Sequence, residues 1–262
     1  MKLSKKITFA FAFSYLACGS AQTTELLEIQ FSGNIHQTIT DQNGQLISND
    51  QQLVNYNLID GMVFNTGLIG DLDASELDAV HLADDCGPNL YSLDIMSSVN
   101  NQIVKPADVF TDDGSLIFDA TSLGLADGTN VDAISRNPNN CDLVLSFDGH
   151  VKLGEDIFTG GHLISWNLVD GFNVFNAFLS DLPVDALYVL ENNNLLVSFA
   201  HNVVVNGTLA QFNDVIEINP SNVSVVTFNP LIVDSSWEKS NLNALNAVSV
   251  LNGDLIFING FE

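Results

Sequence analysis

The strongest constraint on the fold of this chain is a segment that occurs more than once. "NVDAISRNPNNCDLVLSF" (Asn130 to Phe147) is followed about fifty residues later by "PVDALYVLENNNLLVSF" (Pro183 to Phe199). Each begins with a short apolar-led strand, crosses a turn rich in Asn, and returns on a second strand. Because self-similarity at a fixed period is typical of repeat architectures, we expect the chain to be assembled from copies of one unit.

Four copies can be aligned, and they begin with "LDAV", "VDAI", "VDAL" and "LNAV". The second residue of each copy is its anchor position, and successive anchors lie 53 to 61 residues apart. The anchors are Asp78, Asp132, Asp185 and, in a copy that starts at Leu245, Asn246.

Apolar residues alternate with other residues in the return strands "LVLSF" and "LLVSF". A period of two places the apolar residues on one face of a sheet and does not suit a helix. We therefore expect one face of each return strand to pack against a neighbouring copy. The residues on this face are Leu143, Leu145 and Phe147 in one copy, and Leu195, Val197 and Phe199 in the next.

A second pair of strands is predicted between the copies. It starts with an Asp followed by an aliphatic residue, in "DVFTDDGSLIF" from Asp108, "DIFTGGHLISW" from Asp156 and "DVIEINPSNVSVVTF" from Asp214. One repeat is then four strands. No segment after the N-terminus has the sustained 3.6-residue apolar period of a helix.

Four-stranded units in tandem at about fifty residues predict an all-β fold, a β-propeller of four blades. The fourth copy lacks strands, so we expect N-terminal strands such as "TELLEIQFSGN" or "QQLVNYNLIDGMVF" to complete the last blade. Five blades follow if residues 25–70 form a blade of their own. A β-sandwich is the alternative fold, because it also uses short alternating strands.

Two short motifs of the chain resemble segments of other proteins. The "VDAL" start followed by "LLVSF" is similar to repeats of propeller-like proteins secreted by Gram-negative bacteria, whose function is unknown, and the similarity covers Leu77 to Phe257. The ending "IFINGFE" resembles an Ile-Phe-x-x-Gly-Phe-Glu tail on secreted proteins of such bacteria. The resemblance implies export. It does not indicate any particular activity.

Residues 1–21 have the layout of a secretory signal peptide: basic residues, an apolar run from Ile7 to Ala17, and small residues before the expected cleavage after Ala21. The run is too short for an ordinary transmembrane helix. We expect a single domain over residues 22–262, secreted or periplasmic. Alternatively, "LAC" is a lipoprotein box that anchors Cys18 in the outer membrane, although Tyr15 stands where that box has an aliphatic residue.

Removal of the signal leaves two cysteines, Cys86 and Cys141, at matching places in two copies. Disulfides persist in exported proteins, so a Cys86–Cys141 bridge is predicted. Two separate thiols are the other interpretation.

Composition excludes some partners. The chain has 7 Lys and Arg against 32 Asp and Glu, for a formal net charge of −25. Such a surface repels phosphate groups, which argues against nucleic acid and anionic membrane surfaces. We expect a monomer, and the acidic surface either keeps the chain hydrated or binds divalent cations.

No nucleophile elbow, phosphate-binding loop or zinc helix occurs in the sequence. The histidines are not paired at metal-ligand spacing. His150 and His201 follow the return strands of adjacent copies. In a ring of blades, both side chains could therefore point toward the same end of the central channel.

The anchor residues Asp78, Asp132 and Asp185 are the candidate metal ligands. Rotation about a propeller axis would arrange them as a ring of carboxylates suited to calcium. Alternatively, each accepts hydrogen bonds from backbone N–H groups in its own turn.

Without a convergent catalytic set, the sequence predicts a non-enzymatic binding or surface-interaction module for an unidentified protein or carbohydrate. Such a module could display aromatic residues such as Trp166, Phe172 and Phe175 on one face. The alternative is a secreted hydrolase or lyase on the same scaffold, with calcium as its one candidate cofactor.

Overall fold

The computed structural model describes ten segments of the chain. The signal-peptide prediction for residues 1–21, the lipoprotein alternative at Cys18 and the tail "IFINGFE" lie outside them. The described residues are 24–33, 38–40, 46–48, 52–57, 63–68, 77–176, 179–180, 182–219, 224–229 and 242–251. Their regular structure is entirely β, and they contain no helix that could cross a membrane.

The described strands form four antiparallel four-stranded sheets, which we number as blades 1 to 4. Blade 1 contains β6 (Leu77–His81), β7 (Leu90–Leu93), β10 (Val109–Phe110) and β11 (Leu116–Phe118). Blade 2 contains β12 (Val131–Arg136), β13 (Leu143–Phe147), β16 (Leu163–Asn167) and β17 (Gly171–Asn176). Blade 3 contains β18 (Val184–Val189), β19 (Leu195–Phe199), β22 (Val215–Ile218) and β23 (Ser224–Phe228). Blade 4 contains β24 (Leu242–Leu251), β1 (Thr24–Gly33), β4 (Gln52–Asn57) and β5 (Val63–Leu68).

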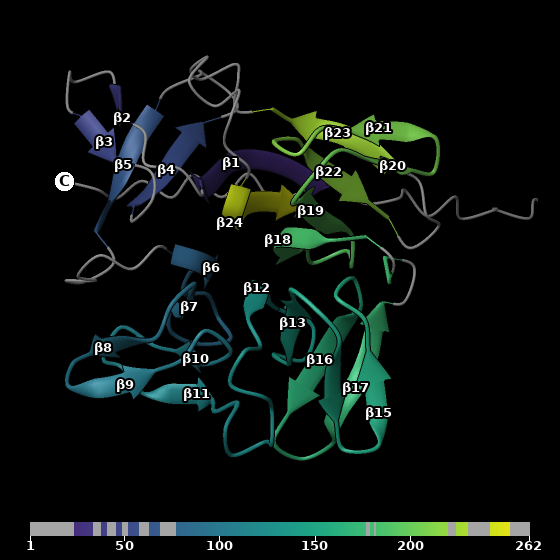
Figure 1. The fold of residues 1–262 in the computed structure, drawn as a ribbon. Coiled ribbons are helices and arrows are strands. Elements are labelled where there is room, and N and C mark those ends of the chain that lie inside the picture. Colours follow the sequence, from purple (N-terminus) through teal and green to yellow (C-terminus); the bar gives the residue numbers. More distant parts are fainter. Residues whose placement is uncertain are drawn as a thin grey trace, which may run out of the picture.

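The first strands of the blades, β6, β12, β18 and β24, lie together at the centre of the molecule, and the sheets extend outward from them (Figure 1). Contacts join β6 to β12, β12 to β18, β18 to β24, and β24 to β6. The prediction of a four-bladed β-propeller is therefore confirmed. A β-sandwich would have placed the strands in two facing sheets, and four separate sheets exclude it.

Blade 4 is assembled from the two ends of the described chain. Strand β24 pairs with β1, and β1 pairs with β4, so N-terminal strands complete the last blade as predicted. Residues 25–70 do not form a fifth blade of their own, because their strands β1, β4 and β5 belong to the sheet that β24 opens.

The anchor of the fourth copy is wrong in the sequence alignment. In blades 1 to 3 the anchor Asp is the extra residue of a β-bulge, as Asp132 is between the pairs Val131–Phe147 and Ala133–Ser146. In blade 4 the equivalent register shift falls between Ala244 and Leu242, which makes Asn243 the anchor. The alignment chose Asn246 because "LNALNA" repeats the same three residues in two registers.

Each repeat also has a two-stranded hairpin between its second and third strands, so the prediction of four strands per repeat is too low. The hairpins are β2–β3 (Thr38–Thr40, Leu46–Ser48), β8–β9 (Ser97–Val99, Gln102–Val104), β14–β15 (Val151–Leu153, Asp156–Phe158) and β20–β21 (Val203–Val205, Thr208–Ala210).

This hairpin corrects the alignment of the second strand pair. Asp108 and Asp214 stand just before β10 and β22, and each side chain accepts a hydrogen bond from the backbone N–H three residues earlier, both at 2.8 Å. Asp156 instead begins β15 of the hairpin. The equivalent residue in blade 2 is His162, whose Nδ1 accepts the N–H of Thr159 at 2.9 Å.

The core lies between adjacent sheets. Leu143, Leu145 and Phe147 pack with residues of blade 1, including Phe118, whose ring lies 6.4 Å from that of Phe147. Leu195, Val197 and Phe199 pack with blade 2 residues such as Val144. The predicted packing of the return strands against neighbouring blades is confirmed. Both faces of β13 and β19 are buried, however, because each blade is covered on two sides.

At one end of the inner strands, the turns that connect the first and second strands of neighbouring blades are joined by a disulfide and by a hydrogen bond. Cys86 and Cys141 form the predicted disulfide between the turns of blades 1 and 2. Asn139 Nδ2 donates to Asn193 Oδ1 at 3.0 Å, which joins the turns of blades 2 and 3. The rings of His81 and Tyr188, from blades 1 and 3, stack with centroids 5.8 Å apart.

Candidate functional site

The opposite end of the inner strands carries the three anchor aspartates, and two of them share a partner. Asn130, the residue before β12, donates its amide to Asp78 Oδ2 at 2.6 Å and to Asp132 Oδ1 at 3.1 Å. The amide therefore joins carboxyls of blades 1 and 2. Its own oxygen is buried with no hydrogen-bond partner. We call this end the aspartate mouth.

Burial dominates the electrostatics of these carboxyls. Removal from water raises the pKa of Asp78 to about 8, opposed by the Asn130 hydrogen bond and reinforced by the charge of Asp185. Burial, followed by the charges of Asp78 and Asp185, raises the pKa of Asp132 to about 9. Desolvation and like charges both disfavour the ionised form, so Asp78 and Asp132 hold their protons at neutral pH.

Among the described residues, no group of three or more His, Cys, Asp and Glu side chains is arranged to hold a metal ion. The alternative role for the anchors, as acceptors of backbone N–H groups in their own turns, also stays a prediction, because the hydrogen bond that Asp132 accepts comes from the side-chain amide of Asn130. Calcium binding by Asp78, Asp132 and Asp185 stays a prediction.

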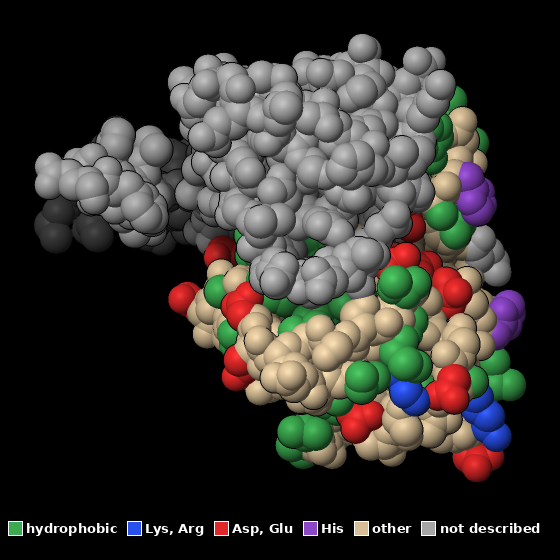
Figure 2. All heavy atoms as spheres, turned by 60° about the vertical axis from the view of Figure 1, so that its left-hand side comes forward, with side chains coloured by type: hydrophobic (Ala, Val, Ile, Leu, Met, Phe, Trp, Pro, Cys, Tyr) green, Lys and Arg blue, Asp and Glu red, His purple; other side chains and the backbone are tan. Residues whose placement is uncertain are grey.

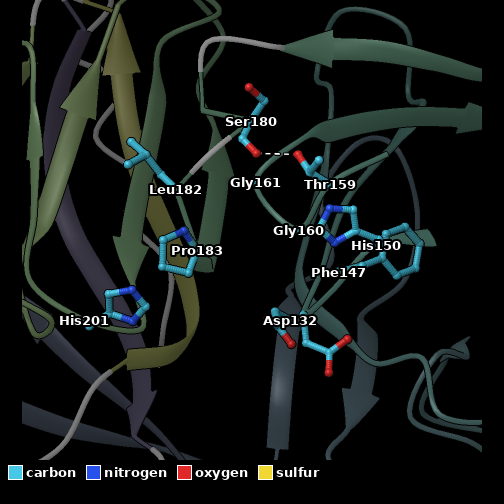
Figure 3. A pocket seen from close by; sticks show the side chains of 11 residues that line it. Asp132, Phe147, His150, Thr159, Gly160, Gly161, Ser180, Leu182, Pro183 and His201 are labelled. Carbon is cyan, nitrogen blue, oxygen red and sulfur yellow. Dashed lines mark hydrogen bonds between the residues drawn. The ribbon is translucent and has the colours of Figure 1, made fainter. Parts of the chain in front are cut away.

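A pocket of about 380 Å³ opens at the aspartate mouth between blades 2 and 3. Its walls come from the second-to-third strand connection of blade 2 on one side, and from the start of β18 and the end of β19 on the other (Figure 3). The lining residues are Asp132, Phe147, Asp148, His150, Thr159, Gly160, Gly161, Ser180, Leu182, Pro183 and His201.

The two histidines singled out from the sequence both line this pocket, as the ring arrangement predicts. His201 lies with Pro183 on the blade 3 wall, and His150 lies on the blade 2 wall with Thr159 (Figure 3). Both histidines are exposed. His81 and His162 do not line the pocket: His81 Nε2 lies 3.0 Å from Asp84 Oδ2, and His162 Nδ1 lies 2.7 Å from the hydroxyl of the lining residue Thr159.

The linker between blades 2 and 3 crosses the pocket close to the blade 2 wall. The Thr159 hydroxyl donates to the carbonyl of Ser180, and it also contacts His162 Nδ1 at 2.7 Å. A Cβ added at Gly161 would lie 1.9 Å from the Leu179 carbonyl oxygen, so only glycine fits there. "TGGH" is thus the sequence signal of a close approach, which the repeat analysis did not use.

The aromatic residues proposed for a binding face pack against the core clusters to different degrees. Trp166 is 7% exposed and meets Phe118 edge-on, with ring centroids 5.3 Å apart. Phe172 packs against the same cluster, and Phe175 packs against the cluster between blades 2 and 3. Trp166 is therefore not displayed for binding, whereas Phe172 and Phe175 are partly exposed and pack against neighbouring blades.

Acidic side chains lie on both flanks of the described surface in Figure 2, whereas the few Lys and Arg side chains gather at its lower right. In this part of the surface, Lys105 Nζ forms an ion pair with Asp127 Oδ1 at 2.7 Å. Among the described residues, no Lys or Arg lines the pocket. The pocket therefore combines two carboxyls and two imidazoles with apolar walls.

No family model matches the chain, and no curated protein matches it by sequence. Solved structures match weakly. Virginiamycin B lyase from Staphylococcus aureus is 13% identical with a TM-score of 0.31, over 79% of this chain and 61% of the lyase, which is less than two thirds of its length. A streptogramin B lyase is 10% identical with a TM-score of 0.34, over 79% of this chain and 74% of that chain. A chain of a nidogen/laminin complex is 14% identical with a TM-score of 0.35, over 85% of this chain and 97% of that one. Similarity at this level assigns no function.

Proposed function

We propose that this protein is an exported β-propeller that binds a small ligand in the pocket at the aspartate mouth. The observation that carries the proposal is the pocket itself, a concave site of about 380 Å³ between two blades, lined by both apolar and polar side chains. Small-molecule sites have this size and mixed character, and they often lie between structural units.

The two ends of the inner strands differ in a way that supports this assignment. At the far end, the disulfide, the Asn139–Asn193 hydrogen bond and the stacked rings of His81 and Tyr188 join the blades across the axis. The aspartate mouth instead presents exposed side chains, such as His150 and His201, around a hollow. A disulfide between blades also suits a protein that works outside the cytoplasm.

The test is a binding screen of the purified chain against carbohydrates and small metabolites, followed by a variant that fills the pocket. His201→Trp places a bulky side chain at an exposed lining position and should abolish binding of a genuine ligand. Leu209→Trp is the matched control, since Leu209 is 60% exposed on β21 and does not line the pocket. Ligands that bind equally well to both variants would contradict the proposal.

The same screen separates binding from catalysis. A non-enzymatic module returns its ligand unchanged, whereas a hydrolase or lyase converts it, so each ligand is recovered after incubation and analysed by mass spectrometry. Calcium is tested in parallel by melting the chain with calcium or with a chelator. A calcium-dependent rise in melting temperature that is absent from Asp132→Asn would assign the ion to the anchors, and equal curves would remove calcium from the proposal.

A further inference from the structure

We infer that a second cavity between blades 2 and 3 binds an uncharged, polyhydroxylated ligand of the size of one sugar ring. The cavity has a volume of about 230 Å³ and shares no lining residue with the pocket at the aspartate mouth, so the inference is independent of the proposed function. We call this site the amide cavity. Its lining residues are Phe175, Asn176, Asn193, Leu195, Ile218 and Asn219.

The amide cavity is formed by the outer strand of blade 2 and by two strands and a turn of blade 3. The end of β17 contributes Phe175 and Asn176. Blade 3 contributes Asn193 from the turn between β18 and β19, the first residue of β19, and the last residue of β22 with the one after it. Drug-sized ligands occupy pockets of roughly 300–1,000 Å³, so this smaller cavity suits a single ring.

Every polar side chain of the lining is a neutral amide. Asn176, Asn193 and Asn219 each carry an NH2 donor and a carbonyl acceptor. A sugar hydroxyl also donates and accepts, so an amide can pair with it in either direction. None of the six lining residues is ionisable, although the chain carries 32 Asp and Glu. A charged ligand would leave water without a counter-charge there, which favours a neutral one.

Asn193 is positioned for binding by contacts within the protein. Its backbone has a φ of 63°, and its N–H donates to the Leu190 carbonyl at 2.9 Å. Its side-chain Oδ1 accepts a hydrogen bond from Asn139 Nδ2 of blade 2 at 3.0 Å. Because this bond occupies the oxygen, the NH2 group is the part of the amide that can donate to a ligand hydroxyl. A donor that is already held in place loses little conformational entropy on binding.

The apolar part of the lining suits the faces of a sugar ring. Leu195 and Ile218 are 2% and 1% exposed, and Phe175, which is partly exposed, packs against their cluster. A pyranose carries hydroxyls around its edge and C–H groups on its faces. It can therefore lay one face on Phe175 while its edge meets the amides. Of the three aromatic residues predicted for binding, Phe175 is the one that lines this cavity.

The experiment titrates the chain with D-glucose, D-galactose and D-mannose, and with the uronate of each, and follows binding by ligand-observed NMR. At least one hexose should bind. It should bind at least about fivefold more tightly than its uronate, because an acidic chain repels the added negative charge. Phe175→Leu keeps the wall apolar but removes the aromatic face, and it should weaken binding of that hexose severalfold.

The role of the amide is tested with a matched pair of variants. Asn193→Gly removes the amide and keeps the backbone, since glycine adopts a positive φ freely, and it should weaken binding at least about threefold. Asn206→Gly is the control and should leave the affinity unchanged, because Asn206 also has a positive φ and lines neither cavity. Melting curves establish that the variants are folded.

Three results would each overturn the inference: no binding of any of the three hexoses at tens of millimolar, a uronate that binds as tightly as its hexose, or equal affinities in Asn193→Gly and Asn206→Gly. His201→Trp, which fills the pocket at the aspartate mouth, should leave hexose binding unchanged. A hexose that binds Asn193→Gly normally and fails to bind His201→Trp would be a ligand of that other pocket. This result would overturn the inference and support the proposed function.

Discussion

At the scale of single residues, Asp132 makes stability depend on pH in the direction opposite to that of most carboxyls. The ordinary pKa of this carboxyl is 3.8, and burial raises it to about 9 in the folded chain. Between about pH 4 and pH 9 the unfolded chain releases this proton while the folded chain keeps it, so this group lowers the free energy of unfolding as the pH rises. Asp132→Asn removes that dependence. At pH 8 it should raise the melting temperature by roughly 3 °C or more, because one pKa unit is worth about 1.4 kcal/mol and about 1 kcal/mol moves the melting temperature by roughly 2–4 °C.

At a pH well below 3.8, wild type and Asp132→Asn should melt together, since the carboxyl is then protonated whether the chain is folded or not. Asp156→Asn corrects for the change in net charge, because Asp156 is exposed on β15. A variant that is less stable than wild type at pH 8 would show that the folded chain requires the ionised carboxylate at this position.

At the scale of elements, strand β13 tests the packing between blades. Phe147 is 1% exposed and its ring contacts that of Phe118 in blade 1, so Phe147→Ala should lower the free energy of unfolding by roughly 3–5 kcal/mol. Ser146 on the other face is fully buried and donates to the Gly160 carbonyl at 2.8 Å. Ser146→Ala should therefore cost roughly 0.5–1.5 kcal/mol, not zero. Urea denaturation measures both. A larger loss for Ser146→Ala than for Phe147→Ala would invert this assignment of the two faces.

The connection between β15 and β16 tests the wall of the pocket. A side chain at Gly161 would overlap the carbonyl oxygens of Leu179 and Leu182, so Gly161→Ala should displace the linker between blades 2 and 3 and markedly lower the melting temperature. Gly149→Ala is the control, because a Cβ at Gly149 meets nothing within 4 Å. Equal melting temperatures for the two variants would show that the linker moves aside at little cost.

The elements also show where sequence reasoning succeeds and fails. Period-two apolar patterns predicted the return strands, and the repeated anchors predicted the first strand of blades 1 to 3, because both signals are local. The anchor of blade 4 was misplaced because "LNALNA" fits two registers, and only pairing with β1 distinguishes them. The sequence Asp156-Ile157-Phe158 resembles Asp108-Val109-Phe110, so the two were aligned with each other. For this reason the hairpin β14–β15 was not predicted. The pocket depends on the approach of Gly161 to a distant linker, which no local pattern encodes.

At the scale of the whole molecule, the two ends of the inner strands have separable roles. The end with the disulfide holds blades together, because Cys86 and Cys141 lie in turns of adjacent blades and their Cα atoms are 5.2 Å apart. The aspartate mouth holds the ligand in our proposal. Changes at the first end should therefore alter stability while leaving the pocket intact.

The paired substitution Cys86→Ser and Cys141→Ser tests this separation. The bridge joins residues 55 positions apart. Closing a loop of that length lowers the conformational entropy of the unfolded chain, which stabilises the folded chain by roughly 4 kcal/mol. The variant should melt at a clearly lower temperature and unfold at a lower urea concentration, as should wild type after reduction. Below its melting temperature it should keep the imidazole signals of His150 and His201 and the same affinity for any ligand of the pocket. Loss of binding by a variant that is still folded would mean that the disulfide positions the pocket from the other end of the inner strands, which would contradict the division of roles between the two ends.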